Sequence, residues 1–345
     1  MNIRDRKIFY ALMTLIGLLG ILTSCHREEI PNDNPQQSGT PISFTPTSDW
    51  PTLTKSIITN ENYKDFNFNI WATSEYSNKN FEVFEGEEIK HDGNDIWIPV
   101  SGVEKYWSLG KYDFIAVMPS GHVGTYSDGN LTLDFGDSGY QLGCTSENKD
   151  SQKDFLVAVA EDEFEQKHLN GEKKDPVSLK FFPQLSRINF TISNEISLTG
   201  LESEIIVTGF KIYGNHISAE SWSNDGGWSF KELQGTSENP TPYFSASELS
   251  IEVNTKTVLV NDLLVFPEEC SLSILVTYVE KVNGIESPAV TKSSSVPIQC
   301  AWQSGNQYTY PLKVMNSGVV LMGEPSVNPW PEDVTQAGSD IEIKN

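Results

Sequence analysis

The sequence has few histidines, and they lack the spacing of a metal site. The five histidines form no H-x-x-x-H or H-x-H pair, the common local patterns of zinc ligands. No G-x-S-x-G turn, P-loop or dinucleotide-binding glycine pattern occurs either. The Glu87-Glu88 pair could serve glycoside hydrolysis only if the fold set two carboxylates at the right separation. We therefore expect a protein that is not an enzyme, with no cofactor and no metal site.

Basic residues are also scarce. The chain has 24 Lys+Arg against 47 Asp+Glu, a formal net charge of -23. This balance excludes nucleic acid as a partner, because phosphates demand basic patches, and it disfavours adsorption to anionic lipid. The acids are scattered along the chain, which is typical of a solvated surface.

Cysteine is rare, and its pattern leaves two interpretations open. Only Cys144, Cys270 and Cys300 follow Cys25, and no pair has C-x-x-C spacing. In an oxidising compartment Cys270 and Cys300 could form a disulfide. Three structural thiols explain the same residues equally well.

One apolar run stands out, near the N-terminus. Three basic residues precede residues 8–22, which carry no charge and are too few to span a bilayer. The run ends in Leu22-Thr23-Ser24-Cys25, which resembles the lipobox of bacterial lipoproteins. We predict that residues 1–24 are a signal peptide and that Cys25 is lipidated and anchors the protein to the outer membrane. The alternative is an ordinary secretory signal followed by a chance cysteine.

Residues 25–40 are polar and are expected to form a tether between the lipid and the fold. Their acidic start, Glu28-Glu29, resembles the signal that sends lipoproteins of the Bacteroides group to the cell exterior. We therefore expect a surface-exposed protein.

The remaining chain is dominated by alternating and short apolar patterns that predict β-strands. Strands are expected at 42–44, 66–72, 95–100, 111–118, 131–135, 155–160, 177–192, 204–213, 258–266, 272–279 and 308–314. The segment 177–192 is either one strand bent at Pro183 or two strands. Residues 224–227 predict a turn between Trp222 and Trp228. Residues 161–175 are charged and have the only modest helical composition. They divide the predicted fold into an N-terminal β-sandwich at 41–165 and a C-terminal β-sandwich with a terminal tail at 176–345.

Tryptophans offer a second functional hypothesis. Exposed indole rings stack on sugars, so the chain could be a surface glycan-binding lipoprotein, with a hydrolase of unrecognised site as a third reading. In a β-sandwich such residues are more often core. The candidates are Trp71, Trp97, Trp107, Trp222, Trp228 and Trp302.

Several short motifs follow one another along the chain: Tyr106-Trp107, residues 112–116, 153–158, 177–181, 185–190 and 302–310, and Pro329-Trp330. Their order is similar to that of fimbrillin-like proteins, the pilin lipoproteins of Bacteroides-group bacteria. The resemblance covers nearly all of the chain after the signal, and its specificity lies in order and spacing. It implies two transthyretin-like β-sandwich domains in tandem and a shaft or tip subunit of a fimbrium. Its partners would be other fimbrial subunits, joined by strand exchange, and a host or bacterial surface ligand.

The chain departs from the family pattern at two points. Pro183 stands where members often have a histidine, two residues before Leu185-Ser186. Some members are also cut by a trypsin-like protease after a basic residue that follows the first strand. Here the nearest candidate is Lys55, in place of an arginine.

The last residues suggest a strand that can be donated. Ile341 and Ile343 alternate with charged residues and give one apolar face. Such a segment suits insertion into a neighbouring subunit, whose pockets take alternate side chains. The alternatives are that it frays in solvent or adds an edge strand to its own domain.

Overall fold

The computed structural model describes residues 40–46, 58, 62–108, 110–164, 176–196, 198, 200–230, 235–236, 239–253, 256–293, 297–321 and 324–329. Within these residues the fold is all-β, as expected. The helical segments of this part are two short 3-10 helices, Tyr63–Asp65 and Lys149–Ser151. None of the described segments is a helix long and apolar enough to cross a membrane.

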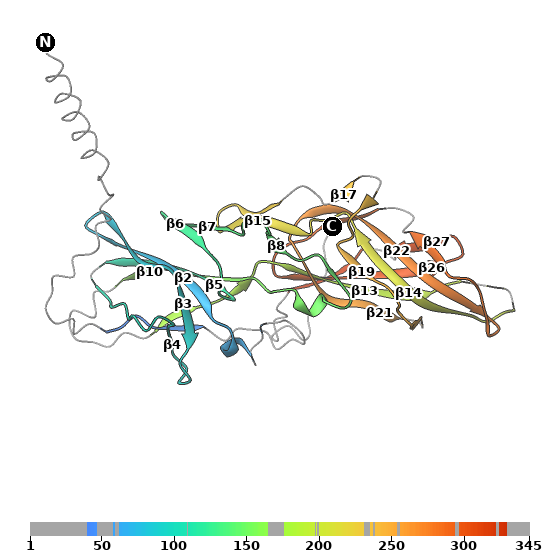
Figure 1. The fold of residues 1–345 in the computed structure, drawn as a ribbon, viewed down its shortest axis with the longest axis horizontal. Helices are drawn as coiled ribbons and strands as arrows, with labels where there is room; N and C mark the ends of the chain where they lie inside the picture. The colour runs from blue at the N-terminus through green and yellow to red at the C-terminus, as the bar shows by residue number, and fades with distance from the viewer. Residues whose placement is uncertain are drawn as a thin grey trace, which may run out of the picture. The chain divides into compact units, whose positions relative to one another are not determined.

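Eight strands form the first sheet, and they do not pair in chain order (Figure 1). The two edge strands are separated in sequence by residues 180–181 alone, so the sheet has to curl until its edges approach each other. In sheet order the strands are β11 (Val177–Leu179), β1 (Phe44–Pro46), β4 (Trp97–Pro99), β3 (Lys79–His91), β2 (Phe68–Tyr76), β5 (Lys111–Met118), β10 (Leu156–Phe164) and β12 (Phe182–Pro183).

The curled sheet is buried on both faces in its central strands. Side chains alternate across a strand, and in β5 both sets are apolar. Tyr112 and Phe114 point into the inner core, whereas Ile115 and Val117 belong to a second, larger core on the outer face. Burial on both faces fits the short apolar runs at 70–72 of β2, 114–118 of β5 and 156–158 of β10.

A second sheet shares that outer core, and its strands come from both halves of the chain. Rings of Trp222 and Trp228 lie 5.3 and 4.9 Å from that of Phe155, which precedes β10. The two tryptophans are directly opposite each other on a hairpin whose turn was predicted at residues 224–227. The strands are β16 (Gly227–Phe230), β15 (Ser218–Ser223), β7 (Asn130–Asp134) and β6 (Gly124–Ser127), with β8 (Tyr140–Gln141) paired to β15.

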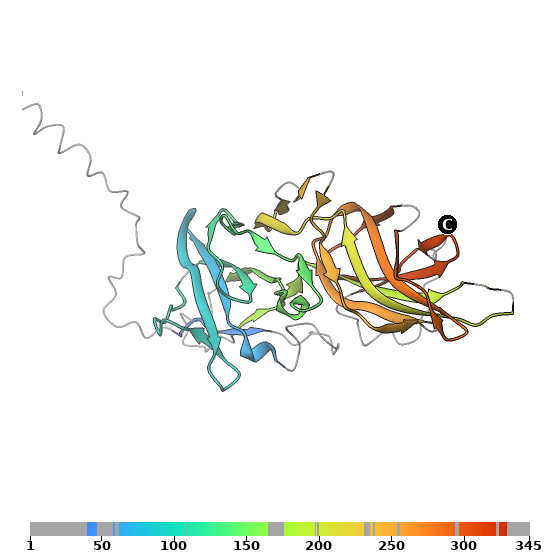
Figure 2. The same cartoon turned by 45° about the vertical axis from the view of Figure 1, so that its right-hand side comes forward.

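Two further sheets form the C-terminal part (Figure 2). One contains β21 (Thr257–Val265), β13 (Ser186–Asn194), β26 (Asn306–Met315) and β27 (Gly318–Leu321), with β28 (Ser326–Pro329) on β26. The other contains β23 (Ile285–Glu286), β22 (Glu269–Val282), β14 (Ser203–Tyr213), β19 (Phe244–Ala246) and β9 (Cys144–Thr145). Also attached are β20 (Ile251–Val253) on β14, and β24 (Val290–Ser293) and β25 (Ile298–Ala301) on β22. A separate pair is β17 (Gly235–Thr236) with β18 (Asn239–Pro240).

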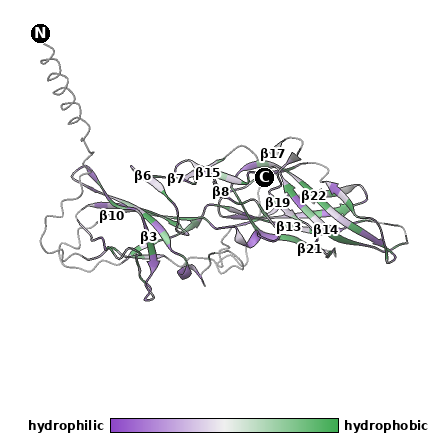
Figure 3. Cartoon of the chain, in the orientation of Figure 1, coloured by the Kyte–Doolittle hydropathy of each residue, from purple (hydrophilic) through white to green (hydrophobic). Residues whose placement is uncertain are grey.

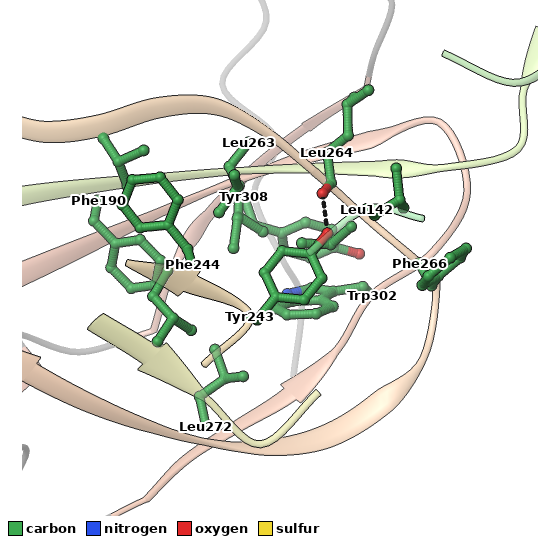
Figure 4. Packing of buried hydrophobic residues seen from close by; sticks show 14 of the residues in the cluster. Leu142, Phe190, Tyr243, Phe244, Leu263, Leu264, Phe266, Leu272, Trp302 and Tyr308 are labelled. Atoms are coloured by element: carbon green, nitrogen blue, oxygen red, sulfur yellow. Dashed lines mark hydrogen bonds between the residues drawn. The ribbon is translucent and has the colours of Figure 1, made fainter. Parts of the chain in front are cut away.

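These two sheets pack face to face through aromatic side chains. The Phe190 ring on β13 lies 5.1 Å from that of Tyr310 on β26 and 5.5 Å from that of Phe210 in the opposite sheet. Hydrophobic residues alternate with hydrophilic ones along β14 and β22 (Figure 3), and the hydrophobic set is the buried one. In the same core the buried Tyr243 hydroxyl donates to the Leu264 carbonyl (Figure 4), so its one polar group is satisfied.

The predicted strands are mostly confirmed, with one informative difference. Residues 177–192 form β11, β12 and the start of β13, where we expected one bent strand or two. Because β11 pairs with β1 and β12 with β10, strands from both sides of the charged segment share the first sheet. Pro183 lies on the edge strand β12, where the missing N–H costs no ladder hydrogen bond.

Candidate functional site

Strand β1 is short and is inserted between two neighbours of the curled sheet. It runs parallel to β11 over three residue pairs and meets β4 at one pair, Phe44 with Trp97. Further backbone hydrogen bonds hold the residues beside this pairing. The Ile42 N–H donates to Lys105 O at 2.7 Å, and the Val177 N–H donates to Ser43 O at 2.8 Å. The backbone pairing of β1 itself is therefore short.

Those side chains fill the inner core. Ile42 and Phe44 are 3% and 0% exposed and alternate with half-buried residues. The Phe44 ring makes edge contacts with Phe84, Phe114 and Phe68, at centroid distances of 5.6, 5.9 and 6.0 Å. Full burial of such a side chain contributes about 1.5–3 kcal/mol. We call β1 the plug, and the space between the rings of Phe68, Phe84 and Phe114 that its Phe44 fills the aromatic cleft.

Motifs that carried the family resemblance surround this plug. Trp107 donates its N–H to Thr40 O at 3.2 Å, and its ring lies 4.7 Å from that of Tyr112. Residues 177–179, part of another motif, are the strand β11 itself. The sequence therefore identified the surroundings of the site, although it did not show that they meet.

The arrangement can support exchange of one strand for another. Removal of β1 would leave the facing edges of β4 and β11 without their partner and expose the aromatic cleft. Unpaired strand edges are templates for an incoming strand. A segment with apolar side chains at alternate positions would satisfy both the edges and the cleft.

The residues predicted from sequence for lipidation, proteolytic cleavage and strand donation lie outside the described residues. They are Cys25, Lys55, Ile341 and Ile343. Lys55 belongs to the connection between β1 and β2, and Ile58 in the same connection is buried in the inner core.

The histidines of the described part are packed against aromatic rings. His122 lies among Phe135, Tyr140 and Phe155, and burial lowers its pKa to about 4. His216 stacks on Phe230 and pairs with Glu268 at 2.6 Å. The described ranges contain no group of three His, Cys, Asp or Glu that could hold a metal ion.

The acidic pair Glu87-Glu88 also has a structural explanation. Neighbouring residues of β3 point to opposite faces, so the two carboxylates diverge. Asn67 and Ser120 donate to Glu88 at 2.9 and 2.7 Å, and these hydrogen bonds lower its pKa. Glu88 thus stays ionised and joins β3 to the segments that flank β2 and β5.

Five of the six candidate tryptophans are buried, and Trp228 is half-buried. The indole N–H of Trp228 donates to Gln184 O at 2.9 Å. A cavity of about 450 Å³ is lined by residues 119–122, 139–144, 148 and 151–153, and none of these is a tryptophan. The six candidate tryptophans therefore form no exposed surface on which a sugar ring could stack.

The described part of the chain is all-β, with several sheets packed around two apolar cores. The model of the family described as fimbrillin-like matches residues 54–330, so the chain belongs to the fimbrillin-like family. No curated protein matches it.

Solved structures agree with this assignment at the level of the fold. A fimbrial protein from Bacteroides vulgatus is 16% identical, with a TM-score of 0.61, 84% of this chain covered and 99% of that chain. A candidate cell adhesion protein from Bacteroides ovatus is 13% identical, with a TM-score of 0.50 and coverages of 85% and 99%. Similarity at these identities concerns the fold alone.

Proposed function

We propose that this protein is a structural subunit, shaft or tip, of a cell-surface fimbrium that assembles by strand exchange and supports adhesion to a host or bacterial surface. The family supports a fimbrial role. The observation that supports the mechanism is β1, which makes three residue pairs with β11 and one with β4 and buries Phe44 completely. While β1 is in place, its buried side chains stabilise the first sheet. Its removal would expose the aromatic cleft and the facing edges of β4 and β11.

Proteolysis after Lys55 would release β1, because the cut lies between β1 and β2. The freed cleft would accept the segment around Ile341 and Ile343 of the next subunit, whose alternation resembles that of Ile42 and Phe44. Such a contact is head-to-tail and does not close, so it produces a filament.

The remaining elements of the proposal concern organisation and location. We retain two tandem transthyretin-like domains, and the pairing of residues 177–183 with the first sheet favours a division after Pro183. Acylation at Cys25 would hold the precursor on the outer membrane with the fold exposed at the surface. The burial of the candidate tryptophans argues against the glycan-binding alternative.

A processing experiment tests the mechanism. Full-length precursor and Lys55→Gln are treated with a trypsin-like protease at limiting dose and examined by N-terminal sequencing and electron microscopy. We expect filaments only from protein that begins at Ser56. A third variant lacking residues 339–345 should be cut normally and stay monomeric.

Two results would contradict the proposal. Filaments from uncut Lys55→Gln at the normal rate would show that removal of β1 is unnecessary. Filaments from the truncated variant would exclude the tail as the donor. Lys64→Gln changes the other lysine of the connection between β1 and β2 and is the matched control. It should be cut after Lys55 and assemble normally.

A further inference from the structure

Cys270 and Cys300 lie directly opposite each other on neighbouring antiparallel strands. They are paired in the register of β22 with β25. The Trp302 N–H donates to Glu268 O at 3.0 Å, so that position, two pairs away, is a hydrogen-bonded pair. Because the two pair types alternate, Cys270 and Cys300 are also such a pair, with Cα atoms about 5.5 Å apart. Disulfides usually join Cα atoms about 4.4–6.8 Å apart.

The two thiols are in contact and do not point away from each other. The Cys270 thiol donates a hydrogen bond to the Cys300 sulfur, and this bond lowers the pKa of Cys300. The Tyr310 hydroxyl donates to the same sulfur at 3.3 Å and itself accepts from the Trp302 indole N–H at 2.8 Å. The Cys300 sulfur is therefore held in place by the surrounding core.

Access to the pair is unequal. Cys300 is 6% exposed, whereas Cys270 is only half-buried. The third thiol, Cys144, lies on β9 beside β19, and burial raises its pKa to about 12. An external disulfide reagent therefore meets Cys270 before Cys300, and Cys300 lies opposite Cys270 to complete the bond. The hydrogen bond to Cys300 also raises the pKa of Cys270, so its proton must leave before it can attack.

We propose that Cys270 and Cys300 are a disulfide-forming pair, oxidised by thiol exchange with a small-molecule or oxidoreductase disulfide. The Cys270 thiol passes its proton to the neighbouring Cys300 sulfur, and the exposed Cys270 sulfur attacks one sulfur of the oxidant. This step gives a mixed disulfide and releases a thiolate, which takes up the proton from Cys300. The Cys300 thiolate then attacks the Cys270 sulfur and releases the second thiolate, which takes a proton from solvent. The net reaction converts two protein thiols and one external disulfide into one protein disulfide and two external thiols.

The bond would fasten a weakly held part of the fold. β25 has only four residue pairs with β22, and after it the chain leaves this sheet for β26, which pairs with β13 in the opposite sheet. A Cys270–Cys300 bond closes residues 270–300 into a loop and fixes the point where the chain crosses between the sheets. This inference is independent of the role of β1.

The test uses the full chain, equilibrated in mixtures of reduced and oxidised glutathione and then quenched with iodoacetamide in denaturant. Peptide mass spectrometry then identifies which cysteines are linked. We expect one linked peptide pair, Cys270 with Cys300, at oxidising ratios, and its loss in reducing mixtures. Cys144→Ser is the control and should retain the link, whereas Cys270→Ser and Cys300→Ser should lose it.

A structural readout separates a specific bond from chance oxidation of unfolded protein. Circular dichroism should be the same for the oxidised and reduced chains, and oxidation should slow unfolding in urea at least tenfold in the wild type and in Cys144→Ser only. Full alkylation of Cys270 and Cys300 in folded protein at every oxidising ratio would overturn the proposal. So would a link that forms only in urea, or one that involves Cys144.

Discussion

Replacement of Phe44 by alanine should loosen β1 selectively. The Phe44 side chain is fully buried among three phenylalanine rings, and Phe→Ala substitutions in such sites cost about 3–5 kcal/mol. Because β1 is short and precedes the rest of the sheet, the loss should appear as local opening of β1. At about 3 kcal/mol, the open population rises by roughly 100-fold.

Amide hydrogen exchange measures this opening directly. The Val177 N–H donates to Ser43 O and the Trp107 N–H to Thr40 O, so both become free when β1 leaves. In Phe44→Ala both amides should exchange roughly 100-fold faster, while amides in β13 and β26 keep their protection.

The matched control removes a ring of similar burial from the other core. Phe190→Ala should weaken the C-terminal sheets and leave the exchange of the Val177 amide unchanged while the chain is folded. If Phe44→Ala leaves the Val177 amide at the wild-type rate, or accelerates all amides equally, β1 is not a separable plug. The mechanism argued from it would then be wrong.

Three further predictions concern other parts of the chain. The folded pKa of His122, about 4, lies below its unfolded value. The contribution of His122 to stability should therefore be complete above pH 6.5 and fall by about 3 kcal/mol as the pH drops to 4. Urea denaturation should show a smaller pH dependence in His122→Gln. The pKa of Glu88 is also lowered, so its contribution to stability is present above its ordinary pKa and is lost in more acidic solution. Glu88→Gln should reduce the loss of stability at acid pH in the same titration. An unchanged titration would show that the hydrogen bonds from Asn67 and Ser120 do not stabilise the fold. Cys25→Ala should abolish fatty-acid labelling, and labelling that persists would exclude lipidation at this residue.

Local pattern was sufficient to predict much of the strand content. Residues 111–118 end before Pro119, and the turn at 224–227 joins two strands, because Pro and Gly act on their immediate neighbours. The bend or break expected at Pro183 is present, but periodicity could not assign the pieces to β11 and β12 on opposite edges of one sheet. Pairing between distant strands depends on which edges meet, and alternation along one strand carries no such information.

The candidate site was harder to predict for the same reason. Ile42 and Phe44 had the pattern of a short strand, yet nothing local indicated that Val177 would lie beside Phe44. Burial was also ambiguous: six tryptophans looked alike in sequence, and only the sheets show that five are core residues and one is half-buried. The register of β22 with β25 shows that Cys270 and Cys300 lie opposite each other, which their spacing in the sequence could not show.

The parallel pairing of β1 with β11 has a consequence for biogenesis. Phe44 and Val177 are 133 positions apart, and Arg187 and Gln307 on the parallel strands β13 and β26 are 120 apart. Contacts this distant form slowly, because a long loop must close before they contribute. A chain that emerges N-terminus first exposes its aromatic cleft until residues 177–179 arrive. During this interval the aromatic cleft can bind a strand of another chain that has apolar side chains at alternate positions. Newly exported chains should therefore be kept apart until their own β1 has paired with β11.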